Sequence, residues 1–147
     1  MKSEPELTFS KIEIEVIPHE QQRYETAGDW YMRDGVLVIK VSKLPNDSEG
    51  FMSFAIVIHE LIEVALCKKA GVTQKMVDDF DMAYEKTRHP NDFESEPGDH
   101  AEAPYRDQHC FATAVERMFI AACKIAWVDY ETAIYSLPDA PDKSAPV

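Results

Sequence analysis

The chain has 147 residues, of which 45% are hydrophobic and 10% aromatic. This composition suits one domain with a hydrophobic core and excludes a disordered or collagen-like chain. Asp and Glu number 27 against 15 Lys and Arg, which gives a net charge of -12, and no Lys- or Arg-rich run could follow a phosphate backbone. We therefore expect no nucleic-acid partner.

The cysteines and the N-terminus bear on the compartment. Cys67, Cys110 and Cys123 are odd in number and none belongs to a C-x-x-C pair, a pattern typical of reduced core cysteines. The N-terminus lacks a positively charged start followed by an apolar run, and no apolar stretch approaches the ~20 residues of a membrane span. We expect a cytoplasmic protein with no membrane partner.

The first third of the chain is predicted to form strands. Residues 11–18 alternate between apolar and polar side chains, which is typical of a half-buried strand, and a proline ends the pattern. Residues 29–33 lead through an Asp-Gly pair at 34–35 into the Val- and Ile-rich segment 36–42. Together these predict a hairpin whose second strand is the more buried.

Helices are predicted to follow. One covers 51–70 and ends at Gly71, in a position where glycine commonly terminates helices. Thr73 is a suitable N-cap for another helix from 74 to about 88. Residues 89–103 contain two prolines and a glycine and should form a long loop, and loops of that length in compact domains are usually functional or disordered.

A long helix is then predicted from Pro104 to about Trp127, with the proline at its first position. Its inward face should consist of Phe111, Val115, Met118, Phe119, Ala122, Ile125 and Ala126. A short helix over 129–136 and a tail at 138–147 without core-forming residues complete the chain. We expect an α+β fold in one domain, residues 1–137, with a small antiparallel sheet of about three strands packed on three main helices.

The predicted helix at 51–70 contains an unusual polar group. From Phe54 to Cys67 the only side chains that are charged or titrate near neutrality are His59, Glu60 and Glu63, and their neighbours are apolar. A helix that is apolar nearly all round is a central one. Burying two carboxylates and an imidazole without partners costs several kcal/mol per ion, so a compensating group is expected, and a divalent metal ion would serve.

The spacing of these residues favours a metal. His59 and Glu63 are four residues apart, so their side chains leave one face of the helix and can reach one ion. Glu60 lies about 100° around the helix from His59, where it can reach a water at the metal. The H-E-x-x-H helix of metalloproteases has the same arrangement, with two metal ligands four residues apart and a general-base glutamate between them.

The segment His59-Glu60-Leu61-Ile62-Glu63 resembles the active-site helix of zincin metallopeptidases, with Glu63 in place of the second histidine. The preceding hairpin resembles the small sheet of minimal, single-domain zincins, and residues 36–42 would then be the edge strand that binds an extended peptide. Short acidic chains of this kind also resemble proteins of phage and bacterial genomes. The resemblance implies a zinc-dependent, peptidase-like hydrolase that binds Zn²⁺ or another divalent ion and uses Glu60 as general base.

A catalytic zinc ion needs a third protein ligand and an open position. We predict His109, in the first turns of the 104–127 helix, which completes a set of His59, Glu63 and His109. Glu116, seven residues further on and on the same stripe, could orient a ligand or replace one. His100, in the loop at 89–103, is the competing third ligand.

Other residues near His109 have more than one interpretation. Tyr105 and Arg106 could donate hydrogen bonds to an oxyanion during hydrolysis, or either could be a packing residue. In an alternative without metal, His59 and the glutamates pair with Arg106 or Arg117 in a buried network. Such a protein, or one that keeps only a structural metal, would act by binding a protein partner through its acidic surface and the aromatic residues Trp127, Tyr130 and Tyr135.

Overall fold

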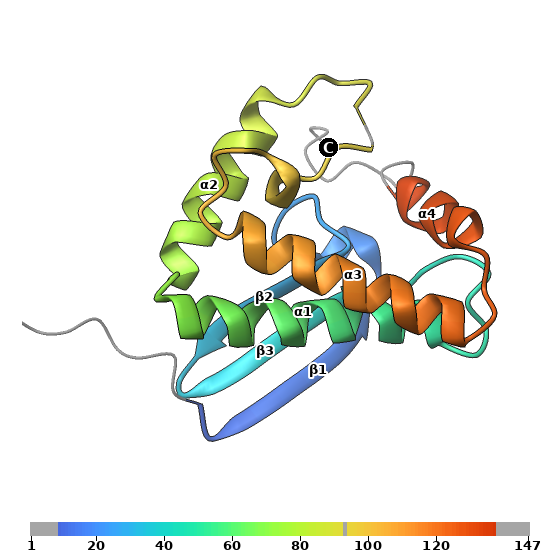
Figure 1. Ribbon diagram of the computed structural model, residues 1–147, viewed down its shortest axis with the longest axis horizontal. Coiled ribbons are helices and arrows are strands. Elements are labelled where there is room, and N and C mark those ends of the chain that lie inside the picture. Colours follow the sequence, from blue (N-terminus) through green and yellow to red (C-terminus); the bar gives the residue numbers. More distant parts are fainter. Residues whose placement is uncertain (1–8, 93, 138–147) are drawn as a thin grey trace, which may run out of the picture.

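A mixed sheet of three strands, in the order β1-β3-β2, forms one layer of the structure (Figure 1). The structure is a computed structural model and describes residues 9–92 and 94–137. β1 (Lys11–Ile17) runs parallel to β3 (Val36–Ser42), and β2 (Gly28–Arg33) runs antiparallel to it. The predicted hairpin is confirmed, but the sheet is mixed, since β1 pairs in parallel.

β3 is the central strand. Leu37, Ile39 and Val41 are fully buried on its helix-facing side, and Val38 is fully buried on the other side. The expectation that residues 36–42 form an edge strand is therefore wrong. A strand with neighbours on both sides is commonly a continuous apolar run, and the Val- and Ile-rich sequence of β3 fits that position.

The helices cover one face of the sheet, with α1 against β3 and β2 and with α3 packed along α1 (Figure 1). Their bounds are Phe51–Ala70 for α1, Gln74–Thr87 for α2, Arg106–Ala122 for α3 and Trp127–Tyr135 for α4. Two short 3-10 helices, η1 (His19–Gln21) and η2 (Pro97–Asp99), lie in the connections. The α+β class is confirmed. No helix in the described ranges is long and apolar enough to cross a membrane, and the tail predicted at 138–147 lies outside those ranges.

The first turn of α1 is capped from a distance. Gly50 precedes the helix in the left-handed conformation and has no side chain to offer. The carboxylate of Asp47 accepts hydrogen bonds from the backbone N–H of Met52 at 3.0 Å and of Ser53 at 2.9 Å, and from the Ser53 hydroxyl at 2.8 Å. Asp47 therefore satisfies N–H groups that a helix start leaves without partners.

Substituting Asp47 by alanine should lower the free energy of unfolding by about 1–2 kcal/mol, because two N–H groups of the helix start lose their acceptor. Chemical denaturation measures this change. Glu49→Ala, in the same exposed loop, is the matched control and should change the free energy of unfolding by less than about 0.5 kcal/mol. Equal effects of the two substitutions would contradict the capping role.

α3 is shorter than the sequence predicted. It starts at Arg106, two residues after Pro104, and ends at Ala122. Lys124 adopts a left-handed conformation with φ of 59°, and the N–H of Ile125 reaches back to the carbonyl of Ile120 at 3.2 Å. This is a Schellman-type helix end, at which glycine is usual. Because a lysine occupies the left-handed position, nothing in the sequence signals the break, and the prediction of one helix to residue 127 was wrong.

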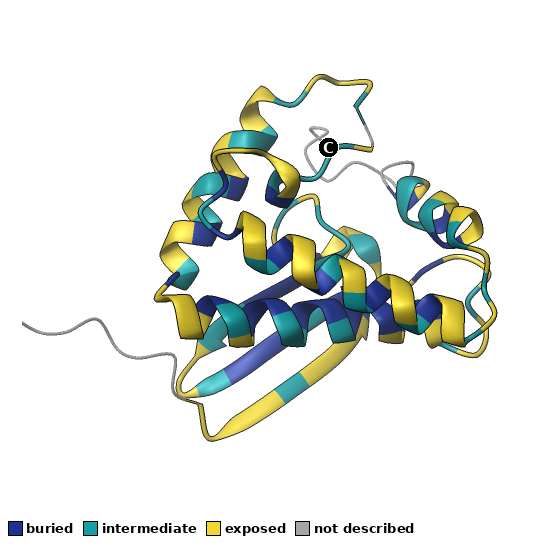
Figure 2. Ribbon diagram, viewed as in Figure 1, coloured by how far each residue is buried: buried dark blue, intermediate teal, exposed yellow. Residues whose placement is uncertain are grey.

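The inward face of α3 is also different from the predicted one. Phe111 and Met118, expected in the core, are 57% and 70% exposed. The buried residues of α3 are instead His109, Ala112, Glu116 and Ile120. The helix therefore turns the stripe with His109 and Glu116 inward and leaves Phe111 and Met118 at the surface. Figure 2 shows buried and exposed positions alternating along α3.

Candidate metal centre

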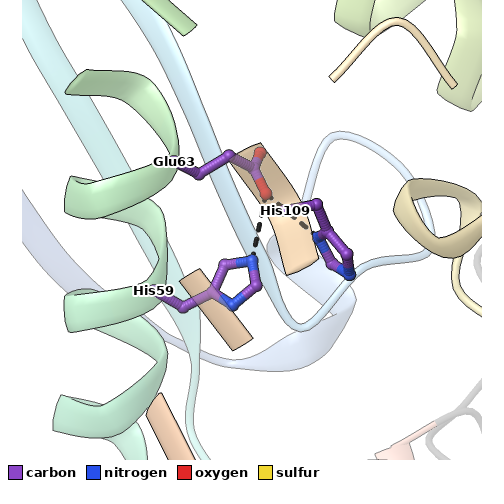
Figure 3. Close-up of side chains that lie close together, drawn as sticks. All are labelled: His59, Glu63 and His109. Carbon is purple, nitrogen blue, oxygen red and sulfur yellow. Dashed lines mark hydrogen bonds and ion pairs between the residues drawn. The ribbon is translucent and has the colours of Figure 1, made fainter. Parts of the chain in front are cut away.

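Three buried side chains from α1 and α3 converge on one point (Figure 3). His59 and Glu63 come from successive turns of α1, and His109 comes from the first turns of α3. Glu63 Oε2 lies 3.0 Å from His59 Nε2 and 3.0 Å from His109 Nδ1. Each residue offers one potential ligand atom, and these atoms lie within 4.8 Å of one another. The structure thus brings together the three residues that the sequence predicted as ligands.

The outer nitrogen of each imidazole is held by a carboxylate. His59 Nδ1 lies 2.8 Å from Glu116 Oε1, and the other Glu116 oxygen accepts a hydrogen bond from the Tyr130 hydroxyl. His109 Nε2 lies 2.8 Å from Glu96 Oε2. A histidine that donates one N–H to a carboxylate keeps its other nitrogen free to bind a metal, and such carboxylates are common behind metal-binding histidines. Both rings are arranged in this way, so the site fits a divalent ion.

Without a metal, these side chains form a charged network. Burial lowers the pKa of His59, but hydrogen bonds with Glu116 and Glu63 outweigh burial and raise it to about 10. Burial raises the pKa of Glu63, yet hydrogen bonds from His109 and His59 hold it at about 2. Protons therefore occupy the site that a metal would take, and metal binding must release them.

Glu60 differs from its neighbours because it has no hydrogen-bond partner among the described residues. Its side chain is buried, lines the same cavity as the three convergent side chains, and has a raised pKa because of burial and the charge of Glu63. A glycine makes room for it: a Cβ atom on Gly28, at the start of β2, would lie 2.5 Å from Glu60 Oε1. A buried carboxylate held beside a cavity without a donor is available to a group that enters the cavity.

The cavity has a volume of about 360 Å³ and opens between the start of β2, α1 and the loop that follows α2. Arg88 stabilises this loop, because its guanidinium donates hydrogen bonds to the backbone carbonyls of Ser95 at 2.6 Å and Asp92 at 3.2 Å. The loop supplies Glu96 to His109. The segment at 89–103 was predicted as a long loop, either functional or disordered, and its described residues from His89 to Gly98 form one wall of the cavity.

A second glycine supports His109. A Cβ atom on Gly98, in η2, would lie 2.3 Å from Cγ of the His109 ring. Gly98→Ala should therefore push the ring away from Glu63 and weaken metal binding by about tenfold or more, the effect typical of losing support behind a ligand. Titration with Zn²⁺ by calorimetry measures the change. Glu102→Ala changes an exposed residue nearby and should leave the Zn²⁺ affinity unchanged. A Gly98→Ala variant that binds Zn²⁺ as tightly as the wild type would contradict the packing argument.

Tyr105 does not present a free hydroxyl to the cavity. Its O–H donates to the carboxylate of Asp81, which also accepts a hydrogen bond from Tyr24 at 3.0 Å. Burial raises the pKa of Asp81 to about 6, although the two tyrosine hydroxyls act in the opposite direction. The ring of Tyr105 meets His109 edge-on at 6.0 Å. An oxyanion role for Tyr105 stays a prediction and requires its hydroxyl to leave Asp81.

The competing residues lie elsewhere. His100 packs its ring against Phe80 at 5.8 Å and Tyr84 at 6.1 Å, so it does not join the cluster. Arg117 lies over the ring of Trp127 and Arg106 is exposed. Within the described residues, neither arginine pairs with the cluster as the metal-free alternative required.

Three contributors to the site were missed by sequence reasoning. Trp30 of β2 donates its indole N–H to Glu63 Oε1 at 3.3 Å, Tyr130 of α4 bonds to Glu116, and Glu96 bonds to His109. Only Glu96 had a signal, because it lies in the Pro- and Gly-containing loop. Trp30 carries no signal in the sequence. Tyr130 was expected on an aromatic interaction surface, but it is fully buried, and both residues reach the site through the packing of β2 and α4.

No family model, curated protein or solved structure matches the chain in the comparisons made. The interpretation of the site therefore depends on the geometry of its own residues. That geometry supplies three potential ligand atoms, a carboxylate behind each histidine, and one further carboxylate, Glu60, to which no described residue donates a hydrogen bond.

Proposed function

We propose that the protein is a zinc-dependent hydrolase of the peptidase-like class. His59, Glu63 and His109 hold the metal and Glu60 is the general base. The observation that carries this proposal is the convergence of the three ligand atoms within 4.8 Å. The carboxylates behind both histidines support it independently.

The ligand set favours zinc, because two imidazoles and one carboxylate are a known catalytic set for that ion and leave a position open. When bound, a zinc ion supplies Lewis-acid activation of water and of a carbonyl group. Glu116 and Glu96 fix the orientation of His59 and His109 by accepting from their outer nitrogens.

Glu60 performs the proton transfer in this proposal. Its carboxylate lies in the cavity, one residue after His59, and no described group donates to it. It takes a proton from the water that attacks an amide carbonyl and returns that proton to the leaving nitrogen. Burial raises the pKa of this carboxylate and so makes it a stronger base than an exposed glutamate.

The edge of β2 limits the length of substrate. The Thr26 hydroxyl donates to the carbonyl of Gly28 at 2.6 Å, and the N–H of Met32 donates to the Gln74 side chain at 2.8 Å. Two backbone groups on this edge are therefore occupied. A long peptide cannot pair along the whole strand, so we propose short peptides or single amides as substrates.

The proposal is tested by metal analysis and by hydrolysis. The purified protein should bind one equivalent of zinc in native mass spectrometry and cleave members of a short quenched-fluorescent peptide library. Chelation should stop the cleavage, and added Zn²⁺ should restore it. Failure to retain zinc after reconstitution would overturn the metal site, whereas bound zinc without cleavage of any amide would support a structural metal.

One observation favours the non-catalytic alternative. The network of His59, Glu63 and His109 is hydrogen-bonded even without a metal, so it could serve as a polar core in a protein that acts through a partner.

For either function we propose the cytoplasm, because the three cysteines form no disulfide.

A further inference from the structure

The two oxygens of the Glu63 carboxylate have different partners. Oε2 lies 3.0 Å from His59 Nε2 and 3.0 Å from His109 Nδ1, and Figure 3 shows both contacts as dashed lines. Oε1 instead accepts a hydrogen bond from the indole N–H of Trp30, on β2, at 3.3 Å. The carboxylate therefore turns one oxygen toward the two histidines and the other toward the sheet.

Trp30 is held in place by the sheet and by the hydrophobic core. Its backbone pairs with that of Ile39 on β3, and the residue is only 3% exposed. An indole N–H can only donate a hydrogen bond, and a buried one needs an acceptor. Among the described residues that acceptor is Glu63. Rotation of the carboxylate away from Trp30 would leave a buried donor without a partner, which is unfavourable.

The start of β2 contacts both carboxylates that α1 brings to the cavity. Gly28 and Trp30 are two residues apart, so they lie on the same face of the strand. Gly28 leaves room for Glu60, whose Oε1 would lie 2.5 Å from a Cβ atom at that position. Trp30 bonds to Glu63, three residues further along α1. One face of β2 therefore leaves the Glu60 carboxylate without a donor and ties one oxygen of Glu63.

The number of oxygens that Glu63 gives to a metal ion decides whether the site stays open. A carboxylate can bind an ion through one oxygen or through both. A catalytic zinc ion has three protein ligands and keeps a fourth position for water or substrate. If Glu63 supplied both oxygens, the second one would compete for that position. An open site therefore needs a group that holds Oε1 away from the ion.

We propose that Trp30 is a positioning residue that restricts Glu63 to one metal-binding oxygen, Oε2. The inference rests on the metal centre of the proposed function and adds the group that keeps its fourth position free. A hydrogen bond to a charged carboxylate favours the one-oxygen arrangement by roughly tenfold or more. His59 and His109 need no such restraint, because each offers a single nitrogen to the cluster.

Removal of the indole N–H without a change in side-chain shape tests this inference. The chain has two tryptophans, Trp30 and Trp127, and Trp127 lies outside the cluster, with Arg117 over its ring. A Trp127→Phe variant therefore carries Trp30 alone. When this variant is produced in a tryptophan auxotroph fed with benzothienylalanine, a sulfur atom replaces the N–H of Trp30. Bound Co²⁺ then reports the coordination number, because a four-coordinate ion absorbs visible light severalfold more strongly than a five-coordinate one.

With ordinary tryptophan, the Trp127→Phe variant should bind one equivalent of Co²⁺ with the strong absorption of a four-coordinate ion, as the wild type should. With the analogue the absorption should fall severalfold, because Glu63 supplies its second oxygen, and peptide hydrolysis should fall about 10–100-fold. Circular dichroism should not change. Equal absorption of bound Co²⁺ with tryptophan and with the analogue overturns this inference alone. Failure to bind Co²⁺ with ordinary tryptophan overturns the metal centre, and the inference with it.

A second variant tests whether the effect of Trp30 passes through Glu63. Glu63→His, in the Trp127→Phe chain, replaces the carboxylate by an imidazole, which binds a metal through one nitrogen. The absorption of bound Co²⁺ should then be the same with tryptophan and with the analogue. A fall caused by the analogue in this chain as well would contradict the proposed role, since a general disturbance of the core would be its cause.

Discussion

Replacing His109 by alanine is expected to abolish zinc-dependent stabilisation of the protein. In the wild type, zinc at about a hundred times its dissociation constant should add about 2.7 kcal/mol to the free energy of unfolding, because it binds only the folded chain. For a domain of this size that corresponds to a rise of about 5–10 °C in the thermal midpoint. Of the three proposed ligands, His109 alone does not lie on α1, so without it the site would lose the link between the two helices.

The control for this prediction is His100→Ala. His100 packs against Phe80 and Tyr84, outside the cluster, so the shift caused by zinc should persist even if the variant is less stable. Differential scanning fluorimetry with and without Zn²⁺ measures both variants. If His100→Ala lost the shift and His109→Ala kept it, the third ligand would have been assigned to the wrong histidine.

The candidate site could be predicted where its chemistry is local. His59, Glu60 and Glu63 lie within five residues of one strongly helical segment, so helical geometry alone decides which of them share a face. The spacing of His109 and Glu116 by two turns likewise predicted one stripe, and the structure buries both.

The apolar pattern of α3 misled the prediction because periodicity identifies an apolar face but not what that face contacts. Phe111 and Met118 recur at helical spacing, so burial was expected, yet α3 is oriented by His109 and Glu116, whose partners lie on other elements. Buried charges cost more when unpaired than exposed apolar side chains do. The partners of the polar stripe therefore decide the orientation of the helix.

The sheet could be predicted only in part for a similar reason. An Asp-Gly pair defines the β2-β3 hairpin locally, and both residues have the positive φ that such turns require. The parallel pairing of β1 with β3 is a long-range choice that no turn encodes. The central place of β3 and the outer place of β1 both follow from it.

Glu60→Gln should separate metal binding from catalysis. The amide has nearly the shape of the carboxylate but cannot accept a proton, so hydrolysis should fall by about 10²–10⁴-fold while one equivalent of zinc is retained. The zinc-free variant should also be more stable than the zinc-free wild type, because a buried carboxylate with no hydrogen-bond partner among the described residues is removed. Peptide cleavage, native mass spectrometry and chemical denaturation measure the three effects.

The gain in stability should depend on pH in a defined direction. Burial, with the charge of Glu63, raises the pKa of Glu60 above its ordinary value of 4.5, so the folded wild type resists ionisation that the unfolded chain undergoes freely. The resulting loss of stability is absent below pH 4.5 and grows as the pH rises above it. The difference between Glu60→Gln and wild type should therefore widen from pH 5 to pH 8. Glu94→Gln, at an exposed position on the rim of the same cavity, is the control. Its difference in stability from the wild type should not widen with pH, and its hydrolysis should not fall. A Glu60→Gln variant that cleaves peptides as fast as the wild type would show that Glu60 is not the general base.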